Sequence, residues 1–294
     1  MAVAPQFENL GMVVARVENL WRLDVFGLRR AEFVIFDPAT RGSLLEYIRG
    51  TDLRFSVHTP MFMPEDYPEN PLLACIVDPD DDRRCRAVGL MMRNMDLAAE
   101  LGGEYTVVHV QRPEQFAGAA PGAFREREAM RMALLSAEAL AAHSDRTGMP
   151  VLLENLMDNA TFYSAAHYLE VLDAFPQLGF CLDVGHLDMD ARRFGINIME
   201  FVQALAPRTR AVHLQNSFGP THPTAPRPWK IPVHPSQNPS DGWVDIRSVL
   251  ATVLRANPDC VINFEFRPEK SQGNEFILEG MNWIRQILIE LDGE

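Results

Sequence analysis

The sequence lacks the long apolar stretches and the cysteine patterns that mark membrane-spanning and disulfide-stapled proteins. It holds no run of about 18 apolar residues, and its start, MAVAPQFENLGMVVARVEN, has no basic region followed by an apolar run. The four cysteines form no CxxC pair, and Cys181 and Cys260 lie inside apolar runs, where a free thiol behaves as a small hydrophobe. We therefore expect a soluble, unexported protein of the reducing cytoplasm, with no membrane partner.

Positive charge is scarce as well. Lys and Arg number 27 against 40 Asp and Glu, which gives a net charge of −13 at pH 7. The segment after His58 adds to this acidic excess with Glu65, Asp66, Glu69, Asp78, Asp80, Asp81 and Asp82. A protein that neutralises several phosphates of DNA usually carries a basic stripe. We expect no nucleic-acid partner, and a small-molecule substrate instead.

What the chain does have is a regular alternation of short apolar strands and amphipathic helices. Strands are expected at residues 10–14, 32–36, 53–58, 105–110, 150–156, 179–183, 209–214 and 260–266. Helices are expected at residues 15–28, 42–49, 82–101, 124–147, 161–174, 195–206, 244–256 and 274–291. Alternation favours parallel pairing, and a (β/α)8 barrel typically takes about 250 residues. The sequence therefore predicts an α/β fold, a single (β/α)8 TIM barrel domain over residues 1–294.

Acidic and imidazole side chains recur where these strands end. The endings are FSVHTP with His58, YTVVHV with His109, VLLENL with Glu154, FCLDVGH with Asp183 and His186, AVHLQN with His213, and VINFEF with Glu265. The carboxyl ends of the strands of a parallel barrel lie on one face. We therefore expect these side chains to line one cavity on that face, with Asp183 and His186 joined by a turn that contains Gly185.

A divalent-metal site is the chemistry that this pattern favours. Glu154, Asp183, His213 and Glu265 end strands five to eight, and three carboxylates with one imidazole make an oxygen-rich set of ligands. Such a set suits Mn²⁺ first, with Co²⁺, Mg²⁺ or Zn²⁺ as alternatives. A single strand-end carboxylate can equally cap the following helix, but several buried together need a cation.

The other histidines divide by their place in the predicted elements. Those near the expected cavity could complete a second metal site or contact the substrate, with packing against loops as the alternative: His58, His109, His186 and, from a long loop, His234. Those expected on the surface are His143, His167 and His222.

Two connections are unusually long, from Thr59 to Asp81 and from Leu214 to Trp243. Long loops within a compact domain are usually functional, so we expect both to cover the cavity, with a peripheral or oligomer contact as the alternative. Basic residues that could bind a phosphate or carboxylate of the substrate are Arg112, Arg227, Lys230 and Arg267.

The ordered motifs VLLENL, LDVGH, AVHLQN and NFEF resemble those of the xylose isomerase-like TIM barrel superfamily over essentially the whole chain. That superfamily holds sugar isomerases and epimerases and the endonuclease IV branch. The resemblance to ketose 3-epimerases implies that Glu154, Asp183, His213 and Glu265 hold one metal, that Glu154 and Glu265 move the proton, and that His186 contacts a substrate oxygen. It also makes a dimer or tetramer the expected assembly.

Two departures from the family patterns bear on the reaction. The epimerases carry an arginine shortly after the strand-seven histidine, where this chain has Asn216, Ser217, Phe218 and Gly219. The endonuclease IV branch adds histidines that match His58, His109 and His186, and a third metal bound by an Asp-x-His pair, whose aspartate is missing before His234.

Three functions therefore remain open. The first, which we favour, is a metal-dependent isomerase or epimerase that acts on a small sugar or polyol through an enediolate, with glutamates moving the proton. The second is an endonuclease IV-like phosphodiesterase. The third is a metal-stabilised barrel that binds a sugar or a partner without catalysis, because a fold does not fix a function.

Overall fold

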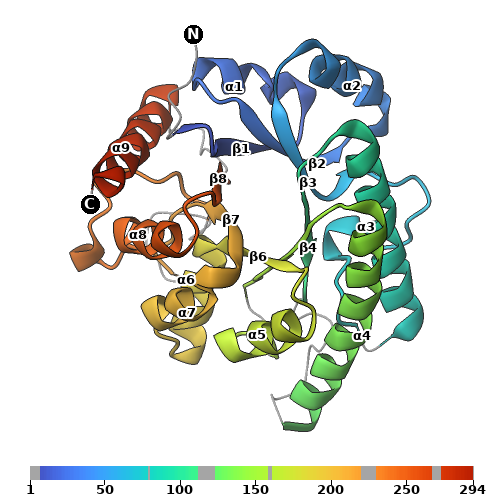
Figure 1. Ribbon diagram of the computed structural model, residues 1–294. Helices are drawn as coiled ribbons and strands as arrows, with labels where there is room; N and C mark the ends of the chain where they lie inside the picture. The colour runs from blue at the N-terminus through green and yellow to red at the C-terminus, as the bar shows by residue number, and fades with distance from the viewer. Residues whose placement is uncertain are drawn as a thin grey trace.

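Eight parallel strands form a closed barrel in the order β1 to β8 in a computed structural model that describes residues 7–78, 80–111, 123–157, 161–219, 230–266 and 273–293 (Figure 1). The strands are β1 Leu10–Val14, β2 Arg30–Phe36, β3 Arg54–Phe62, β4 Thr106–His109, β5 Val151–Glu154, β6 Gly179–Asp183, β7 Thr209–Leu214 and β8 Val261–Phe264. Each strand pairs with its neighbours in sequence, and β8 closes the barrel against β1. The predicted (β/α)8 architecture is confirmed.

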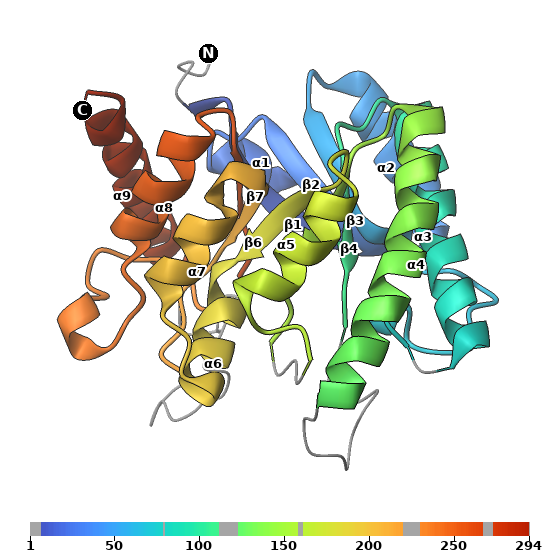
Figure 2. The ribbon, with the colours of Figure 1, turned by 60° about the horizontal axis from the view of Figure 1, so that its bottom comes forward.

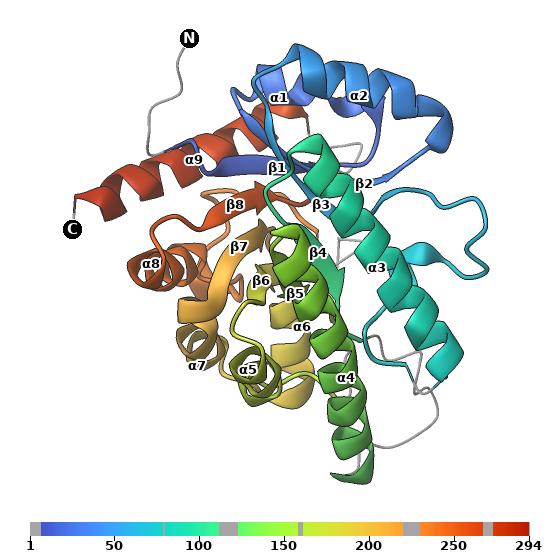
Figure 3. The same ribbon diagram turned by 45° about the vertical axis from the view of Figure 1, so that its right-hand side comes forward.

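Helices surround this barrel on the outside (Figure 1). They are α1 Trp21–Val25, α2 Arg41–Gly50, α3 Asp81–Leu101, α4 Ala123–Thr147, α5 Ala165–Ala174, α6 Val184–Phe194, α7 Ile198–Leu205, α8 Ile246–Ala256 and α9 Asn274–Asp292. Short 3-10 turns lie at Val17–Asn19, Pro38–Thr40, Pro71–Leu73, Ala206–Arg208 and Pro239–Asp241. The long helices α3 and α4 lie side by side (Figure 3), and the C-terminal end of α9 lies at the end of the barrel opposite α6 (Figure 2).

The apolar residues of the strands are divided between two cores. The larger lies between the strands and the helices and includes Phe33, Val57 and Ile284. The smaller fills the barrel interior and consists of Tyr105, Val107, Leu152, Cys181, Ala211 and Val261. This division explains why strands that read as continuous apolar runs still have a face that can carry polar side chains into the barrel.

The register of the strands sets the level of the polar residues at their ends. His109 lies opposite Glu154 across the β4–β5 pair, and Asp183 lies opposite His213 across the β6–β7 pair. Neighbouring strands lie about 4.8 Å apart. Side chains at the same level of adjacent strands are therefore close enough to bind the same ion.

The structure differs from the sequence predictions in a few elements. The residues after Asp183 form the helix α6 instead of a turn, and the segment 15–28 holds a 3-10 turn and one short helix. Strand β3 continues to Phe62, so His58 lies within the strand rather than at its end. Within the described part of the chain, no helix combines the length and apolar character needed to cross a bilayer.

Candidate metal centre at the carboxyl end of the barrel

Four side chains from strands β5 to β8 converge at the carboxyl end of the barrel. Glu154, Asp183, His213 and Glu265 each offer a ligand atom, and these atoms all lie within 4.8 Å of one another. The first three side chains are at most 1% exposed, whereas that of Glu265, which directly follows β8, is 14% exposed. The cluster is therefore accessible to solvent on the side of Glu265 and is enclosed by protein elsewhere.

Asp183 owes its position to three neighbouring groups. It is the N-cap of α6, because its Oδ1 accepts a hydrogen bond of 2.8 Å from the backbone N–H of His186. The Nε2 group of Gln215 donates to both carboxylate oxygens, at 2.8 and 2.6 Å. The side chain of Asn155 bonds to the backbone N–H and C=O of Asp183, at 2.8 and 2.9 Å, where the ladder between β5 and β6 ends. The helix dipole and these donors favour an ionised carboxylate at this position.

The ring of His213 is fixed by carboxylates on both of its nitrogens. Its Nδ1 lies 3.1 Å from Oε1 of Glu154 and 3.2 Å from Oε2 of Glu265, while its Nε2 lies 2.7 Å from Oε1 of Glu32. Glu32 lies within β2 and is fully buried. The sequence pattern does not predict Glu32 as a site residue, because Glu32 lies within a strand and not at its end. The one signal in the sequence is a lone carboxylate inside the apolar run AEFVIF.

A second group of ligand atoms adjoins the first through Glu154. The Oε2 atom of Glu154 lies 3.1 Å from Nε2 of His58 and 3.1 Å from Nε2 of His109, and these two nitrogens are 3.2 Å apart. The other ring nitrogen of His109 lies 2.9 Å from the carbonyl oxygen of Leu72, which belongs to the first long loop. The two oxygens of Glu154 therefore face two different groups of ligands.

His186 lies beside the first group but is held differently. Its Nδ1 lies 3.1 Å from the carbonyl oxygen of Asn155, 3.2 Å from Asp183 and 3.6 Å from Glu154. Burial, followed by the positive charge of Lys230, lowers the pKa of His186 to about 4. The imidazole is therefore neutral near pH 7. Its Nδ1–H donates to the carbonyl oxygen of Asn155, which leaves Nε2 as a hydrogen-bond acceptor.

Lys230 reaches the cluster from the second long loop. Its ammonium group pairs with Oε1 of Glu265, and 16% of its side chain is exposed. Its backbone has φ of 61°, which residues other than glycine rarely adopt. The next residue, Ile231, is bridged to Asn216 by backbone hydrogen bonds of 2.8 and 3.3 Å. This bridge holds Lys230 at the base of the loop, over the cluster.

The electrostatics of the first group favour the binding of a positive charge. Burial acts to raise the pKa of Glu154 and Glu265, but His213 and Lys230 respectively dominate and hold both pKa values well below the usual range. Burial and the negative charge of Glu265 raise the pKa of Asp183 well above its usual range. Three ionised carboxylates therefore cannot coexist here unaided, although Asp183 is surrounded by donors that suit the ionised form.

The residues present fit a divalent cation. Oε2 of Glu265 is buried and accepts no hydrogen bond from the described residues, although it faces the other ligand atoms. Nδ1 of His213 lies 3.1 Å from Glu154 and 3.2 Å from Glu265, and it could bind the same cation through its lone pair when it carries no proton. Carboxylate oxygens with one imidazole are ligands for Mn²⁺, Mg²⁺, Co²⁺ or Zn²⁺.

Other predicted residues lie away from this centre. His234 has its Nδ1 2.7 Å from Ser236 and its Nε2 3.2 Å from Glu279 on α9, and its ring stacks on Phe276. The expectation that His143 is a surface residue is wrong: it is buried and bonds to Asp96 of α3 at 2.7 Å. His167 is half-buried and caps α5. The residues outside the described part of the chain are Arg112, His222, Arg227 and Arg267.

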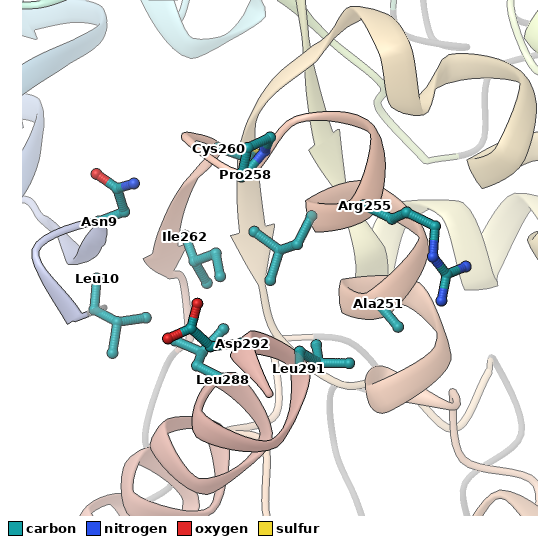
Figure 4. Close-up of a pocket in the computed structure, with 11 residues that line it drawn as sticks. Asn9, Leu10, Ala251, Arg255, Pro258, Cys260, Ile262, Leu288, Leu291 and Asp292 are labelled. Atoms are coloured by element: carbon teal, nitrogen blue, oxygen red, sulfur yellow. The ribbon is translucent and has the colours of Figure 1, made fainter. Parts of the chain in front are cut away.

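A cavity of about 420 Å³ lies at the other end of the barrel, between the first residues of β1 and β8 and the last turns of α8 and α9. Its wall is largely apolar, and Figure 4 shows Leu10, Ile262 and Leu288 converging on it. The chemistry of barrels of this kind is carried at the carboxyl ends of the strands, whereas the opposite face serves stability. This cavity is therefore separate from the ligand cluster.

The fold and the cluster place the chain in the class of (β/α)8 barrels that carry a candidate metal site at the carboxyl ends of their strands. A family model described as the xylose isomerase-like TIM barrel matches residues 26–287, and the chain belongs to this family. No protein of curated function matches the sequence.

Solved structures with the same fold belong to proteins of different activities. A D-tagatose 3-epimerase-like protein is 17% identical, with a TM-score of 0.70 over 97% of this chain and 98% of that one. A protein of Thermus thermophilus soaked with zinc chloride is 23% identical, with a TM-score of 0.60 over 96% and 98%. Endonuclease IV of the same organism is 17% identical, with a TM-score of 0.56 over 96% and 99%. At these identities the likeness defines the fold and leaves the reaction open.

Proposed function

We propose that this protein is a divalent-metal-dependent isomerase or epimerase of a small sugar or polyol-like substrate. The observation that carries the proposal is the placement of two carboxylates on either side of one imidazole. Oε1 of Glu154 and Oε2 of Glu265 lie 3.1 and 3.2 Å from Nδ1 of His213. An ion bound among them would have a potential proton carrier on each side. The epimerase-like relative supports the same class of reaction.

The residues divide the work as follows. A divalent ion held by Glu154, Asp183, His213 and Glu265 would stabilise negative charge on adjacent substrate oxygens, and so acidify the C–H bond between them. Glu154 removes this proton, and Glu265 returns a proton to the same carbon or its neighbour. The pKa values of both carboxyl groups are held low, so Glu154 rests ionised and able to accept the proton, whereas Glu265 must first take a proton from water before it can return one to carbon.

Substrate contacts come from the accessible side of the cluster. His186 presents Nε2 as an acceptor for a substrate hydroxyl, because its Nδ1–H is engaged by Asn155. Lys230 offers a positive charge beside Glu265 for a substrate oxygen or an anionic group. Asn216 and Ser217, which stand where the ketose 3-epimerases have an arginine nearby, are fully buried. We therefore propose a substrate whose charge, if it has one, is bound by Lys230.

Proton transfer gives a direct test for which the product need not be identified beforehand. The Mn²⁺-loaded protein is incubated in D₂O with a panel of ketoses and inososes, and deuterium on carbon is measured by mass spectrometry and NMR. We expect incorporation by the native protein and none by Glu154→Gln or Glu265→Gln, because an amide can neither accept the proton nor return one. Glu128→Gln on α4, whose partner is Arg131, is the matched control. A panel without any exchange, in protein that binds Mn²⁺, would contradict the proposal.

A second candidate function rests on the His58, His109 and Glu154 group. Three ligand atoms separated by 3.1, 3.1 and 3.2 Å would suit a second ion, bridged to the first by Glu154. Paired metals are typical of phosphodiester hydrolysis. The test is hydrolysis of bis(p-nitrophenyl) phosphate by protein loaded with Zn²⁺ or Mn²⁺. Turnover that requires His58 and His109, without deuterium exchange on sugars, would favour the phosphodiesterase.

A further inference from the structure

We propose that Glu32 is a positioning residue for the metal centre, and that its carboxylate sets which nitrogen of His213 faces the ligand cluster. This inference rests on the proposed metal site and adds a residue that would not bind the ion itself. Glu32 and His213 are separated by 181 residues in sequence, yet Oε1 of Glu32 lies 2.7 Å from Nε2 of His213 across the barrel interior. Both side chains are fully buried.

The remaining oxygen of Glu32 is held by two donors on other strands. Oε2 accepts from the hydroxyl of Ser56 on β3 at 3.1 Å and from Nδ2 of Asn263 on β8 at 3.0 Å. Asn263 Nδ2 also lies 2.9 Å from the hydroxyl oxygen of Tyr105. Ser56, Asn263 and His213, on three different strands, thus all donate to the carboxylate of Glu32. These three bonds fix its orientation, with Oε1 as the acceptor for His213.

The backbone of β1 leaves room for this arrangement. A Cβ atom at Gly11 would collide with Oδ1 of Asn263 and would lie 3.0 Å from Cγ of Arg30. Gly11 lies within β1 between Leu10 and Met12, where glycine weakens a strand. The close approach of Asn263, the donor to Glu32, accounts for glycine at this position.

The consequence for His213 follows from its two nitrogens. With Nε2–H donated to Glu32, the lone pair of Nδ1 is left for a cation, between Glu154 and Glu265 at 3.1 and 3.2 Å. If Glu32 could not accept, the proton would move to Nδ1 and bond to one of those carboxylates, in direct competition with the cation. Carboxylate partners of metal-binding histidines typically contribute about 10–100-fold to metal affinity.

A purely structural role for Glu32 predicts different behaviour. Glu32→Met leaves the buried donors of Ser56, Asn263 and His213 without their acceptor, so it should lower the stability of the folded barrel under either role. Under the structural role, the loss would fall on the unfolding transition alone. Under the positioning role, the loss falls on metal affinity and on the nitrogen that binds the metal.

Calorimetric titration with Mn²⁺ separates these roles when four proteins are compared: the native chain, Glu32→Met, Glu32→Gln and Ser56→Ala. We expect about a 10-fold or greater loss of affinity in Glu32→Met, a smaller loss in Glu32→Gln, whose amide oxygen can still accept, and less than about a 3-fold change in Ser56→Ala, which keeps the bond to His213. Thermal unfolding of the metal-free proteins checks that each is folded. Native affinity in folded Glu32→Met would overturn the proposal.

A second measurement needs no variant. In the native protein loaded with diamagnetic Zn²⁺, histidine ¹⁵N NMR should show that the ring of His213 is bound to metal through Nδ1 and carries a slowly exchanging proton on Nε2. Zinc bound to His213 through Nε2 would overturn the role of Glu32 even though the metal site itself stands. Failure of the native protein to bind either Mn²⁺ or Zn²⁺ would instead refute the proposed metal site, and Glu32 would lose its role with it.

Discussion

Replacing Glu154 with glutamine should abolish the stabilisation of the protein by metal. Glu154 is the residue whose two oxygens face both groups of ligands: Oε1 lies 3.1 Å from Nδ1 of His213, and Oε2 lies 3.1 Å from Nε2 of His58. Glutamine keeps the shape but has one oxygen, which is uncharged, and one NH₂ group that would point at either group of ligands. The variant therefore loses a ligand and gains a donor where an ion would bind.

The size of the effect follows from mass action. A ligand present at 100 times its Kd, and bound only by the folded state, stabilises it by about 2.7 kcal/mol. For a chain of this size each kcal/mol shifts the melting temperature by roughly 2 °C, so Mn²⁺ should raise the native melting temperature by about 5 °C. In Glu154→Gln the same Mn²⁺ concentration should shift it by less than about 1 °C, given a loss of affinity of at least about 100-fold.

Differential scanning calorimetry with and without Mn²⁺ measures both shifts, and Glu128→Gln serves as the control. Glu128 lies on α4, outside the barrel strands, and pairs with Arg131 at 2.6 Å. We expect the control to show the native shift. A full Mn²⁺-dependent shift in Glu154→Gln would refute the reasoning, because it would mean that the ion binds without this carboxylate.

Three further outcomes are expected. In metal-free protein, the raised pKa of Asp183 means that its carboxyl group lowers the stability of the folded state increasingly as pH rises above the ordinary pKa of aspartate. The stability advantage of Asp183→Asn over the native chain, measured by urea unfolding at each pH, should therefore grow between about pH 4 and pH 8. An advantage that shrinks as pH rises would contradict this. His58→Ala should leave one Mn²⁺ per chain by metal analysis if the native protein binds two, and an unchanged stoichiometry of two would remove His58 from the second group. The protein should not nick abasic-site duplex DNA at physiological salt, since its net charge is −13 and Lys230, the described basic residue at the cluster, is paired with Glu265. Robust nicking that falls with salt and is lost in Glu265→Gln would promote the phosphodiesterase.

The ligand cluster was predictable because the carboxyl ends of all strands of a parallel barrel lie on one face. An acidic or imidazole residue that follows several apolar residues is easy to recognise in sequence. Parallel pairing places Asp183 opposite His213 and Glu154 opposite Cys181, two residues before Asp183, so all three lie near the same end of the barrel. The fold and these positions could therefore be predicted without information on long-range contacts.

What the sequence concealed depends on contacts that pairing alone does not define. Glu32 lies in mid-strand, and its role emerges only when the interior of the closed barrel brings β2 opposite β7. His143 looked like a surface residue of a helix, but its buried contact with Asp96 exists because α3 and α4 pack side by side. The helix α6 was missed because it begins directly after Asp183, with no intervening loop to signal its start.

Anomalous scattering from crystals soaked in Mn²⁺ tests the central claim most directly. We predict a manganese peak within about 2–2.3 Å of Glu154, Asp183, Glu265 and Nδ1 of His213. A second peak against His58 and His109 would favour the second candidate function while leaving the first site intact. Data that show no manganese among these four residues, in crystals where the ion binds elsewhere, would contradict the account.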